Sequence, residues 1–339
     1  MKKFVIKTFC RILILSAAIT AALWFFLAQP ILSSNPVSET KVDVDRLETH
    51  VKKLSINFHP RNFRQIANLE ATADYIYKHF DAAGGQVETQ AFEASGGLYK
   101  NVSCLFGSGD RARLIVGAHY DSHEETPGAD DNASGVAGLI ELAYLLGNSD
   151  LDIDVELVAY TLEEPPFFGS KSMGSYIHAK ATRDQGREII GMIALEMIGY
   201  FSDEKGSQNY PVPFFKILYP NKGNFIAIIG RTDHRSFTKQ VKRGMKGASK
   251  LPVFSINAPA FITGIDFSDH RNYWHFGYDA VMVTDTAFYR NKAYHTENDT
   301  WDRLDYEKMS QVVSSLHHSI LGFAKESATK PKKDVPKVN

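Results

Sequence analysis

The chain has 339 residues, of which 44% are hydrophobic and 23% are charged, a composition typical of a folded globular protein. This composition excludes a disordered tail protein, a collagen and a membrane protein with many spans. Lysine and arginine number 38 against 39 acidic residues, so no basic surplus indicates a nucleic-acid partner. The two cysteines, Cys10 and Cys104, exclude a disulfide scaffold and a cysteine-rich zinc module.

The amino terminus has the pattern of a membrane signal-anchor. Residues 12–28 are apolar apart from Ser16 and Thr20, and the run approaches the length that spans the hydrocarbon core. Pro30 follows the only plausible cleavage point and disfavours removal of the segment. Basic residues before the run stay in the cytoplasm, so the rest of the chain is expected outside it, in the periplasm or extracellular space. The alternative is a cleaved signal peptide and a secreted protein. The basic residues are Lys2, Lys3, Lys7 and Arg11.

Composition divides the chain into four parts. Residues 1–34 form the predicted anchor, and the polar residues 35–45 form a linker without hydrophobic periodicity. Residues 46–325 contain no comparable linker or internal repeat, which predicts one large domain. Residues 326–339 form a basic tail that we expect to be flexible.

Helix and strand patterns alternate through the predicted domain. Apolar runs typical of strands occur at residues 87–92, 99–106, 114–116, 153–161, 189–195, 225–229 and 280–283, and helical periodicity occurs at 71–80, 136–146 and 306–323. This order predicts an α/β fold with a mixed, mainly parallel central sheet and helices on both faces. In such sheets ligands bind beyond the carboxyl ends of the strands.

Acidic residues and a histidine stand where three of these predicted strands end. His119 follows the first buried strand, Glu163 and Glu164 follow the next, and Glu196 follows the third, while Asp131 precedes a helix. Carboxylates gathered in this way repel one another unless they take up protons or bind a cation. Oxygen and imidazole ligands suit zinc, cobalt or manganese. Each motif alone also fits a structural role, such as a solvated acid pair or a helix cap.

Six segments in this order resemble the M28 family of zinc peptidases, which includes bacterial aminopeptidases, glutamate carboxypeptidases and glutaminyl cyclases. The segments span most of residues 45–325 and are His119-Tyr120-Asp121-Ser122, Pro127 to Gly135, Thr161-Leu162-Glu163-Glu164, Ala194-Leu195-Glu196-Met197, Ser268-Asp269-His270 and Tyr294-His295-Thr296. The resemblance implies the fold of zinc-dependent exopeptidases, which is phosphorylase/hydrolase-like.

The resemblance also implies a metal-ligand set. Two Zn²⁺ ions, with Co²⁺ or Mn²⁺ as alternatives in one site, would share the carboxylate of Asp131, whose peptide bond to the next residue is often cis in the family. One ion would be completed by Glu164 and His295, and the other by His119 and Glu196. Asp121 would orient the ring of His119, as a partner outside the ligand set commonly does. Many family members have aspartate where Glu196 stands, and glutamate remains a competent ligand.

Glu163 matches the family's general base, which would act on a metal-activated water. Adjacent residues of an extended segment point to opposite sides, so Glu163 can face the water while Glu164 faces a metal. Cys104 lies within a predicted strand, far from these motifs, and we interpret it as a core residue rather than a nucleophile.

The predicted function is an exported exopeptidase that removes amino-terminal residues from peptides. Phe267, Tyr273, Phe288, Tyr289 and Arg290 are candidates for the substrate pocket, with core packing as the alternative. Aromatic side chains there would favour an apolar amino-terminal residue, and an acidic site attracts a free amino group.

Three other functions remain open at this stage. Arg271 and Arg290 could grip a substrate carboxylate in a carboxypeptidase. A glutaminyl cyclase would use one zinc in the same place. A non-catalytic receptor, like the transferrin-receptor ectodomain, would have lost ligands, whereas this sequence retains all of them. The expected partners are peptide substrates and, through the amino-terminal helix, a membrane.

Overall fold

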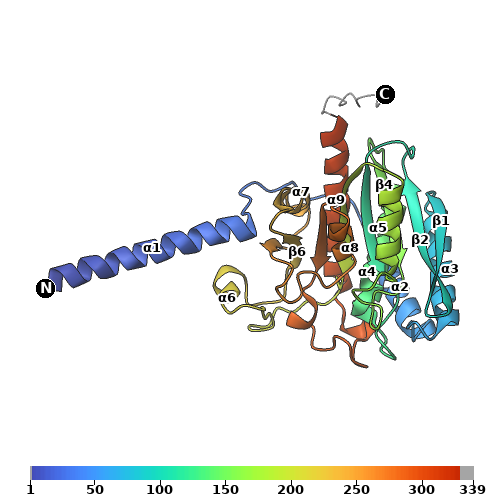
Figure 1. The fold of residues 1–339 in the computed structure, drawn as a ribbon, viewed down its shortest axis with the longest axis horizontal. Coiled ribbons are helices and arrows are strands. Elements are labelled where there is room, and N and C mark those ends of the chain that lie inside the picture. Colours follow the sequence, from blue (N-terminus) through green and yellow to red (C-terminus); the bar gives the residue numbers. More distant parts are fainter. Residues whose placement is uncertain (1, 329–339) are drawn as a thin grey trace.

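Eight strands form one mixed sheet in the computed structural model, which describes residues 2–328 (Figure 1). Their order across the sheet is β1-β2-β4-β3-β5-β8-β6-β7. The four central strands β4, β3, β5 and β8 run parallel to one another, as predicted, while β2 and β6 are antiparallel to their neighbours β4 and β8. The strands are β1 (Gln86–Ala94), β2 (Gly97–Phe106), β3 (Arg113–His119), β4 (Asp154–Tyr160), β5 (Ile189–Glu196), β6 (Ile226–Arg231), β7 (Val253–Ala258) and β8 (Ala280–Thr284).

Helices cover both faces of this sheet. Helices α2, α3, α4, α7 and α9 pack on one face, while α5 and α8 pack together on the other. The helices are α1 (Lys2–Ala28), α2 (Val44–Lys52), α3 (Ile66–Ala82), α4 (Gly135–Leu146), α5 (Gly174–Asp184), α6 (Phe215–Leu218), α7 (Arg235–Met245), α8 (His270–His275) and α9 (Tyr306–Ala328).

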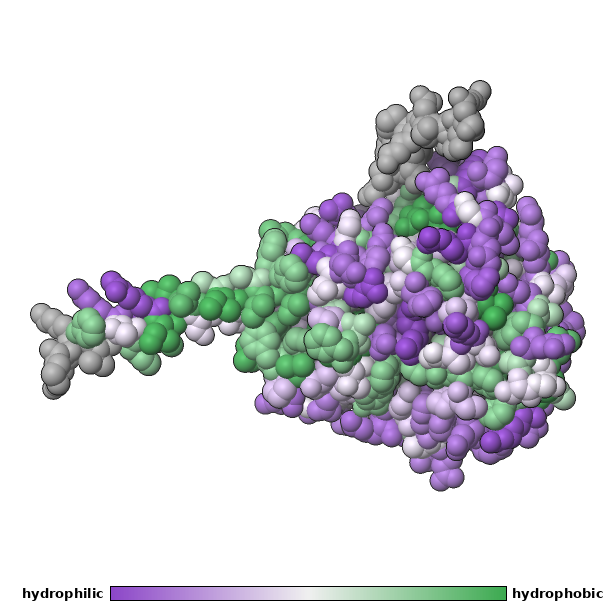
Figure 2. Space-filling view, in the orientation of Figure 1, coloured by the Kyte–Doolittle hydropathy of each residue, from purple (hydrophilic) through white to green (hydrophobic). Residues whose placement is uncertain are grey.

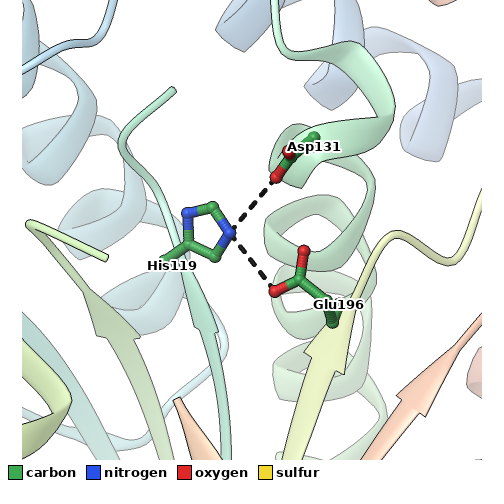
Figure 3. A group of neighbouring side chains, drawn as sticks. All are labelled: His119, Asp131 and Glu196. Atoms are coloured by element: carbon green, nitrogen blue, oxygen red, sulfur yellow. Dashed lines mark ion pairs between the residues drawn. The ribbon is translucent and has the colours of Figure 1, made fainter. Parts of the chain in front are cut away.

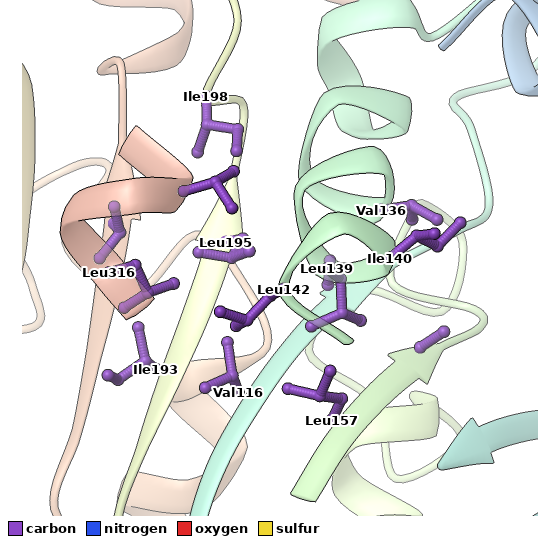
Figure 4. Close-up of a cluster of buried hydrophobic side chains, with 14 of the residues drawn as sticks. Val116, Val136, Leu139, Ile140, Leu142, Leu157, Ile193, Leu195, Ile198 and Leu316 are labelled. Carbon is purple, nitrogen blue, oxygen red and sulfur yellow. The ribbon is translucent and has the colours of Figure 1, made fainter. Parts of the chain in front are cut away.

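The core lies on both sides of the central strands because successive side chains of a strand point to opposite faces. In β3, Leu114 and Val116 join the cluster under α4 and α9, whereas Ile115 joins the cluster on the opposite face. Every residue of β3 and β4 is buried, as expected for strands covered on both faces. Figure 4 shows the first cluster, in which Leu139 of α4 and Leu316 of α9 meet the strands.

The predicted strands and helices are present, and several further elements were missed. Strand β7 and helices α2, α5, α6, α7 and α8 were not predicted, and the last helix continues to Ala328 rather than ending at residue 323. Helix α7 has apolar residues at only three positions of its buried face, among several basic residues. Its hydrophobic pattern is therefore too short to stand out in the sequence.

Helix α1 projects from the side of the domain (Figure 1). Among the described residues, one segment, Ile6–Ala28, is long and apolar enough to cross a membrane, with a mean hydropathy of 2.1 over its most apolar window. The predicted linker contains no helix or strand before α2 begins at Val44. Of the predicted basic tail, residues 329–339 lie outside the described part of the chain.

Candidate metal centre

The candidate ligands meet at the carboxyl edge of the central strands. His119 is the last residue of β3 and Glu196 the last of β5, while Glu163 and Glu164 follow the end of β4. Asp131 lies in a short irregular turn (Ala129–Ser134) that leads into α4. His295 is brought in by the loop that follows β8. The strand-end rule thus placed four of these residues, and the loop histidine was placed by the resemblance.

One group consists of His119, Asp131 and Glu196 (Figure 3). The Nε2 atom of His119 lies 3.3 Å from Asp131 Oδ1 and 3.3 Å from Glu196 Oε2. The three side chains come from β3, the turn before α4, and β5, and they are almost completely buried. Because these side chains are buried and come from three different elements, each of them has little freedom to move.

A second group consists of Asp131, Glu164 and His295. The Nε2 atom of His295 lies 3.2 Å from Asp131 Oδ2 and 3.2 Å from Glu164 Oε2. Asp131 therefore presents one carboxylate oxygen to each group. The five residues predicted as metal ligands are all brought together, in the predicted pairs.

The donor set fits metal ions better than it fits a network of hydrogen bonds. Within residues 2–328, His119 Nε2 and Glu164 Oε1 are buried without any hydrogen-bond partner, which is unusual for polar atoms in a folded protein. Two ligand atoms at about 2.0–2.1 Å from a tetrahedral zinc are about 3.3 Å apart, which matches the separations in both groups. Burial and the nearby Asp131 carboxylate together raise the pKa of the Glu164 carboxyl to about 8. A cation would remove this penalty.

Glu163 lies beside the first group. Its Oε2 atom is 3.9 Å from His119 Nε2, while the adjacent Glu164 faces His295. The two neighbouring glutamates therefore serve different positions, as the alternation of side chains predicts. Burial raises the pKa of the Glu163 carboxyl well above its usual range, and the Glu196 and Glu164 carboxylates add to the effect. A buried carboxyl with a raised pKa suits a group that accepts and returns a proton.

Asp121 has a broader role than the predicted one. Its carboxylate lies 3.5 Å from His119 Nδ1, and its backbone carbonyl is nearer, at 3.2 Å. The carboxylate oxygens accept hydrogen bonds from the backbone amides of Glu163 at 3.2 Å and Glu164 at 3.0 Å. Asp121 therefore holds the segment that carries both glutamates as well as bordering the histidine.

Further residues position the candidate ligands, and few of them were predicted from the sequence. The Asp299 carboxylate accepts hydrogen bonds from the amides of Asp130 and Asp131, and the peptide bond between Asp131 and Asn132 is cis, as the resemblance implied. The Ser268 hydroxyl donates to Glu196 Oε2 at 2.8 Å. Asp299 belongs to none of the quoted segments, so nothing in the sequence pointed to it.

The ring of His295 is held between two other rings. His123 stacks on it with centroids 3.8 Å apart, and Tyr294 stacks on it with centroids 3.7 Å apart. His295 itself adopts a left-handed backbone conformation, with φ at 56°. Residues other than glycine adopt this conformation uncommonly, and those that do cluster at functional sites. The sandwich and the backbone together aim His295 at Asp131.

An apolar pocket opens beside the first group. Glu196 forms part of its wall, together with the predicted residues Phe267, Phe288 and Tyr289. Other walls come from β6, β7 and the segment around α6, and they are largely apolar. Three of the five predicted pocket residues are therefore in the pocket.

The other two predicted pocket residues lie elsewhere, and the prediction for them was wrong. Tyr273 is fully buried, and its hydroxyl hydrogen-bonds the Tyr160 hydroxyl and His178 Nδ1, each at 2.7 Å. Arg290 is also buried, and its Nε donates to Gln208 at 2.8 Å. Arg271 lies over the Phe168 ring, 4.5 Å from its centroid. Packing between distant segments decides these positions, and sequence spacing does not reveal it.

The fold and the site define a metallopeptidase. The model of peptidase family M28 matches residues 101–320, and the chain belongs to this family. It is 47% identical over 296 residues to the uncharacterized protein YfbL of Escherichia coli K12, covering 85% of this chain and 91% of that protein. It is 23% identical over 287 residues to leucine aminopeptidase 1 of Leptosphaeria maculans, covering 79% of this chain and 67% of that protein.

Solved structures confirm the predicted fold. LapB from Legionella pneumophila superposes with a TM-score of 0.64 at 20% identity, covering 84% of this chain and 72% of that one. A glutaminyl cyclase from Bacteroides thetaiotaomicron, bound to N-acetylhistamine, superposes with a TM-score of 0.61 at 18% identity, covering 83% and 98%. The α/β architecture predicted from the sequence is therefore confirmed, and the family match confirms the predicted enzyme class.

Proposed function

We propose that the protein is an exported aminopeptidase that uses two zinc ions and Glu163 as its general base. The observation that carries this proposal is the division of the Asp131 carboxylate, whose two oxygens face two separate histidine–glutamate pairs. His119 and Glu196 would hold one ion, and Glu164 and His295 the other. Zinc ions bound there would supply Lewis acidity that polarises the scissile carbonyl and lowers the pKa of a water molecule.

The chain's own residues account for the remaining chemistry. Glu163 accepts a proton as the water oxygen bonds to the scissile carbonyl carbon. Glu163 then gives this proton to the leaving nitrogen as the peptide C–N bond breaks. Asp121 fixes the backbone of Glu163 through its amide hydrogen bond, so the carboxyl stays beside the site during both transfers.

The adjoining pocket supports an apolar amino-terminal residue as substrate. Phe267 and Phe288 line it beside Glu196, so a side chain bound there would place its own peptide bond near the ligand groups. The carboxypeptidase alternative loses support because Arg290 is buried against Gln208 and Arg271 packs on an aromatic ring. Neither guanidinium is turned toward the pocket as a free carboxylate clamp.

The proposal also includes retention of α1 as a membrane anchor, with the domain in the periplasm or extracellular space. Its length, its mean hydropathy of 2.1 and the absence of buried residues in its most apolar window support this placement. A mature amino terminus near residue 30 would contradict retention and indicate a cleaved signal. Fractionation with membranes is the expected result.

The experiment that tests the activity is a substrate panel on purified protein, combined with elemental analysis. We expect hydrolysis of leucine and phenylalanine anilides with two zinc ions per chain. The glutaminyl cyclase alternative shares this fold, and it predicts cyclisation of an amino-terminal glutamine with one zinc ion. Ammonia release from a glutamine peptide, without anilide hydrolysis, would therefore contradict the aminopeptidase.

A further inference from the structure

The carboxyl-terminal end of α1 is fastened to the β7 edge of the sheet. The Ser255 hydroxyl of β7 donates to the Ala28 carbonyl at 2.9 Å, and Asn257 Nδ2 donates to the Leu27 carbonyl at 3.1 Å. Lys242 of α7 donates to the same Ala28 carbonyl at 2.7 Å. These bonds satisfy carbonyl groups that the end of a helix otherwise leaves unpaired. The domain is therefore fixed relative to α1 rather than joined to it by a loose tether.

The chain that follows α1 runs along the end of α7. The Asn35 amide donates to the Lys246 carbonyl at 3.0 Å, and the Ser38 amide donates to the Ala248 carbonyl at 2.8 Å. The guanidinium of Arg235 lies 3.7 Å from the centroid of the Phe26 ring. Helix α7 is consequently held beside the point where α1 leaves the domain.

The segment around α7 is strongly basic. Residues 231–250 contain seven basic residues and one acidic residue, whereas the rest of the chain has a net charge of −7. Within the described residues, Lys239 and Arg243 are exposed and form no ion pair with a carboxylate. They stand four residues apart, and like charges at this spacing repel one another along a helix. An anionic surface beside α7 would offset that repulsion.

Apolar side chains are exposed on the other side of the α1 attachment. Ile217 of α6 is 75% exposed and Phe261 is 87% exposed, more than any other large hydrophobic side chain described after the linker. Phe261 follows the end of β7 by three residues, so it lies at most about 10 Å along the chain from Ala258. Phe215, two residues before Ile217 in α6, packs in the same cluster as Ala28. Figure 2 shows hydrophobic residues gathered where α1 meets the domain.

We propose that this β7 edge is a membrane-docking surface, which rests on an anionic phospholipid leaflet when α1 is inserted in it. The exposed basic residues of α7 contact the lipid headgroups, and Ile217 and Phe261 enter the interface between headgroups and acyl chains. Basic residues beside a membrane helix are attracted to anionic lipids, and exposed aromatic and aliphatic side chains bind at the interface. The proposal depends on retention of α1 and is independent of the catalytic assignment.

Docking would place the substrate pocket close to the lipid. Phe215 and Tyr219 line the pocket, and Ile217 stands between them in sequence. Contact of Ile217 with the membrane would therefore bring one wall of the pocket to the headgroup layer. The substrates that reach it most readily would be amino termini held at the membrane surface.

Hydrogen exchange on the full chain tests the docking surface. The chain is reconstituted through α1 into nanodiscs of phosphatidylcholine alone or with phosphatidylglycerol. We expect amides of residues 210–219 and 259–263 to exchange at least about threefold more slowly in the anionic nanodiscs, and 0.5 M salt to reduce this protection. Exchange at equal rates in the two lipids would overturn the proposal.

Two charge-reversal variants separate docking from an unspecific charge effect. Lys239→Glu with Arg243→Glu should abolish the lipid-dependent protection. The matched control, Arg64→Glu with Lys78→Glu, changes exposed residues near α3, which packs at the opposite edge of the sheet, and should retain it. Equal loss in both variants would contradict the assigned surface. Failure of the full chain to enter nanodiscs would overturn the proposal together with the anchor.

Anilide hydrolysis in detergent, measured on the same preparations, reports separately on catalysis. The α7 variant should hydrolyse a soluble anilide at the wild-type rate, because Lys239 and Arg243 lie outside the ligand groups and the pocket walls. Ile217→Ser with Phe261→Ser should reduce protection of residues 210–219 in anionic nanodiscs. Unchanged protection in this variant would contradict insertion of these side chains.

Discussion

The candidate ligand group of His119, Asp131 and Glu196 shares Glu196 with the apolar pocket, but the candidate ligands and the pocket walls come from different parts of the fold. Three of the ligand positions stand at or just after the ends of central parallel strands, which are buried on both faces and cannot shift without disturbing the core. The pocket walls come from β6, β7, α6 and the loops between them, at the margin of the sheet. The candidate ligands can therefore stay in place at the rigid strand ends, while the pocket walls at the edge of the sheet can vary among enzymes that act on different substrates.

The largest loss of activity is expected when the carboxylate common to both candidate ligand groups is removed. Asp131→Ala should lower kcat/KM at least about 1,000-fold, because loss of metal binding removes several kcal/mol of transition-state stabilisation. Steady-state kinetics on leucine anilide would measure the loss. The exposed Asp152→Ala is the control and should behave as wild type. Activity within tenfold of wild type in Asp131→Ala would show that this residue is not central.

Glu163 and Glu164 have identical side chains but face different parts of the site, so their variants should have different effects. Glu163→Gln should lower kcat at least about 100-fold and leave the metal content unchanged, as expected when a general base is removed. Glu164→Gln should lower the metal content, since its carboxylate faces His295. Kinetics with elemental analysis would distinguish the two. Loss of metal in Glu163→Gln would assign it as a ligand instead.

Substitutions in the pocket wall should change the substrate preference and leave the catalytic reaction itself unchanged. Phe288→Ala should lower kcat/KM for phenylalanine anilide about tenfold relative to alanine anilide, because it removes part of the apolar wall. Tyr273→Phe serves as the contrast: it should leave the preference unchanged and cost about 1–3 kcal/mol of stability, since buried polar partners lose a hydrogen bond. A preference shift in Tyr273→Phe alone would reverse the two assignments.

A smaller effect is expected on the stability of the fold in acid, through His317, which lies far from the candidate site. Burial and, to a lesser extent, the neighbouring His318 lower the pKa of His317 from 6.5 to about 4. Between these values the unfolded chain binds more protons, so stability falls as pH drops from 6.5 toward 4. Thermal unfolding across this range should show the decline. His317→Gln should flatten it, and an unchanged slope would assign the decline to other groups.

The sequence predicted the strand-end residues of the candidate site better than the elements and residues around them. His119, Glu164 and Glu196 were placed correctly because their positions follow from where buried strands end, which apolar runs reveal. Strand β7 and helix α7 were missed because their patterns are short, and both lie at the β7 edge. Tyr273 and Arg290 were misplaced because their hydrogen bonds join segments about 80 to 110 residues apart. No local pattern records such contacts.

We propose that Asp131 contributes one carboxylate oxygen to each of two separate metal positions. Calorimetric titration of metal-free protein with zinc, using wild type, Glu196→Ala and Glu164→Ala, tests this arrangement. We predict that the wild-type chain binds two zinc ions. Each variant should lose one strong site: Glu196→Ala the site with His119, and Glu164→Ala the site with His295. Binding of a single zinc ion by the wild-type chain, at every concentration used, would contradict the account.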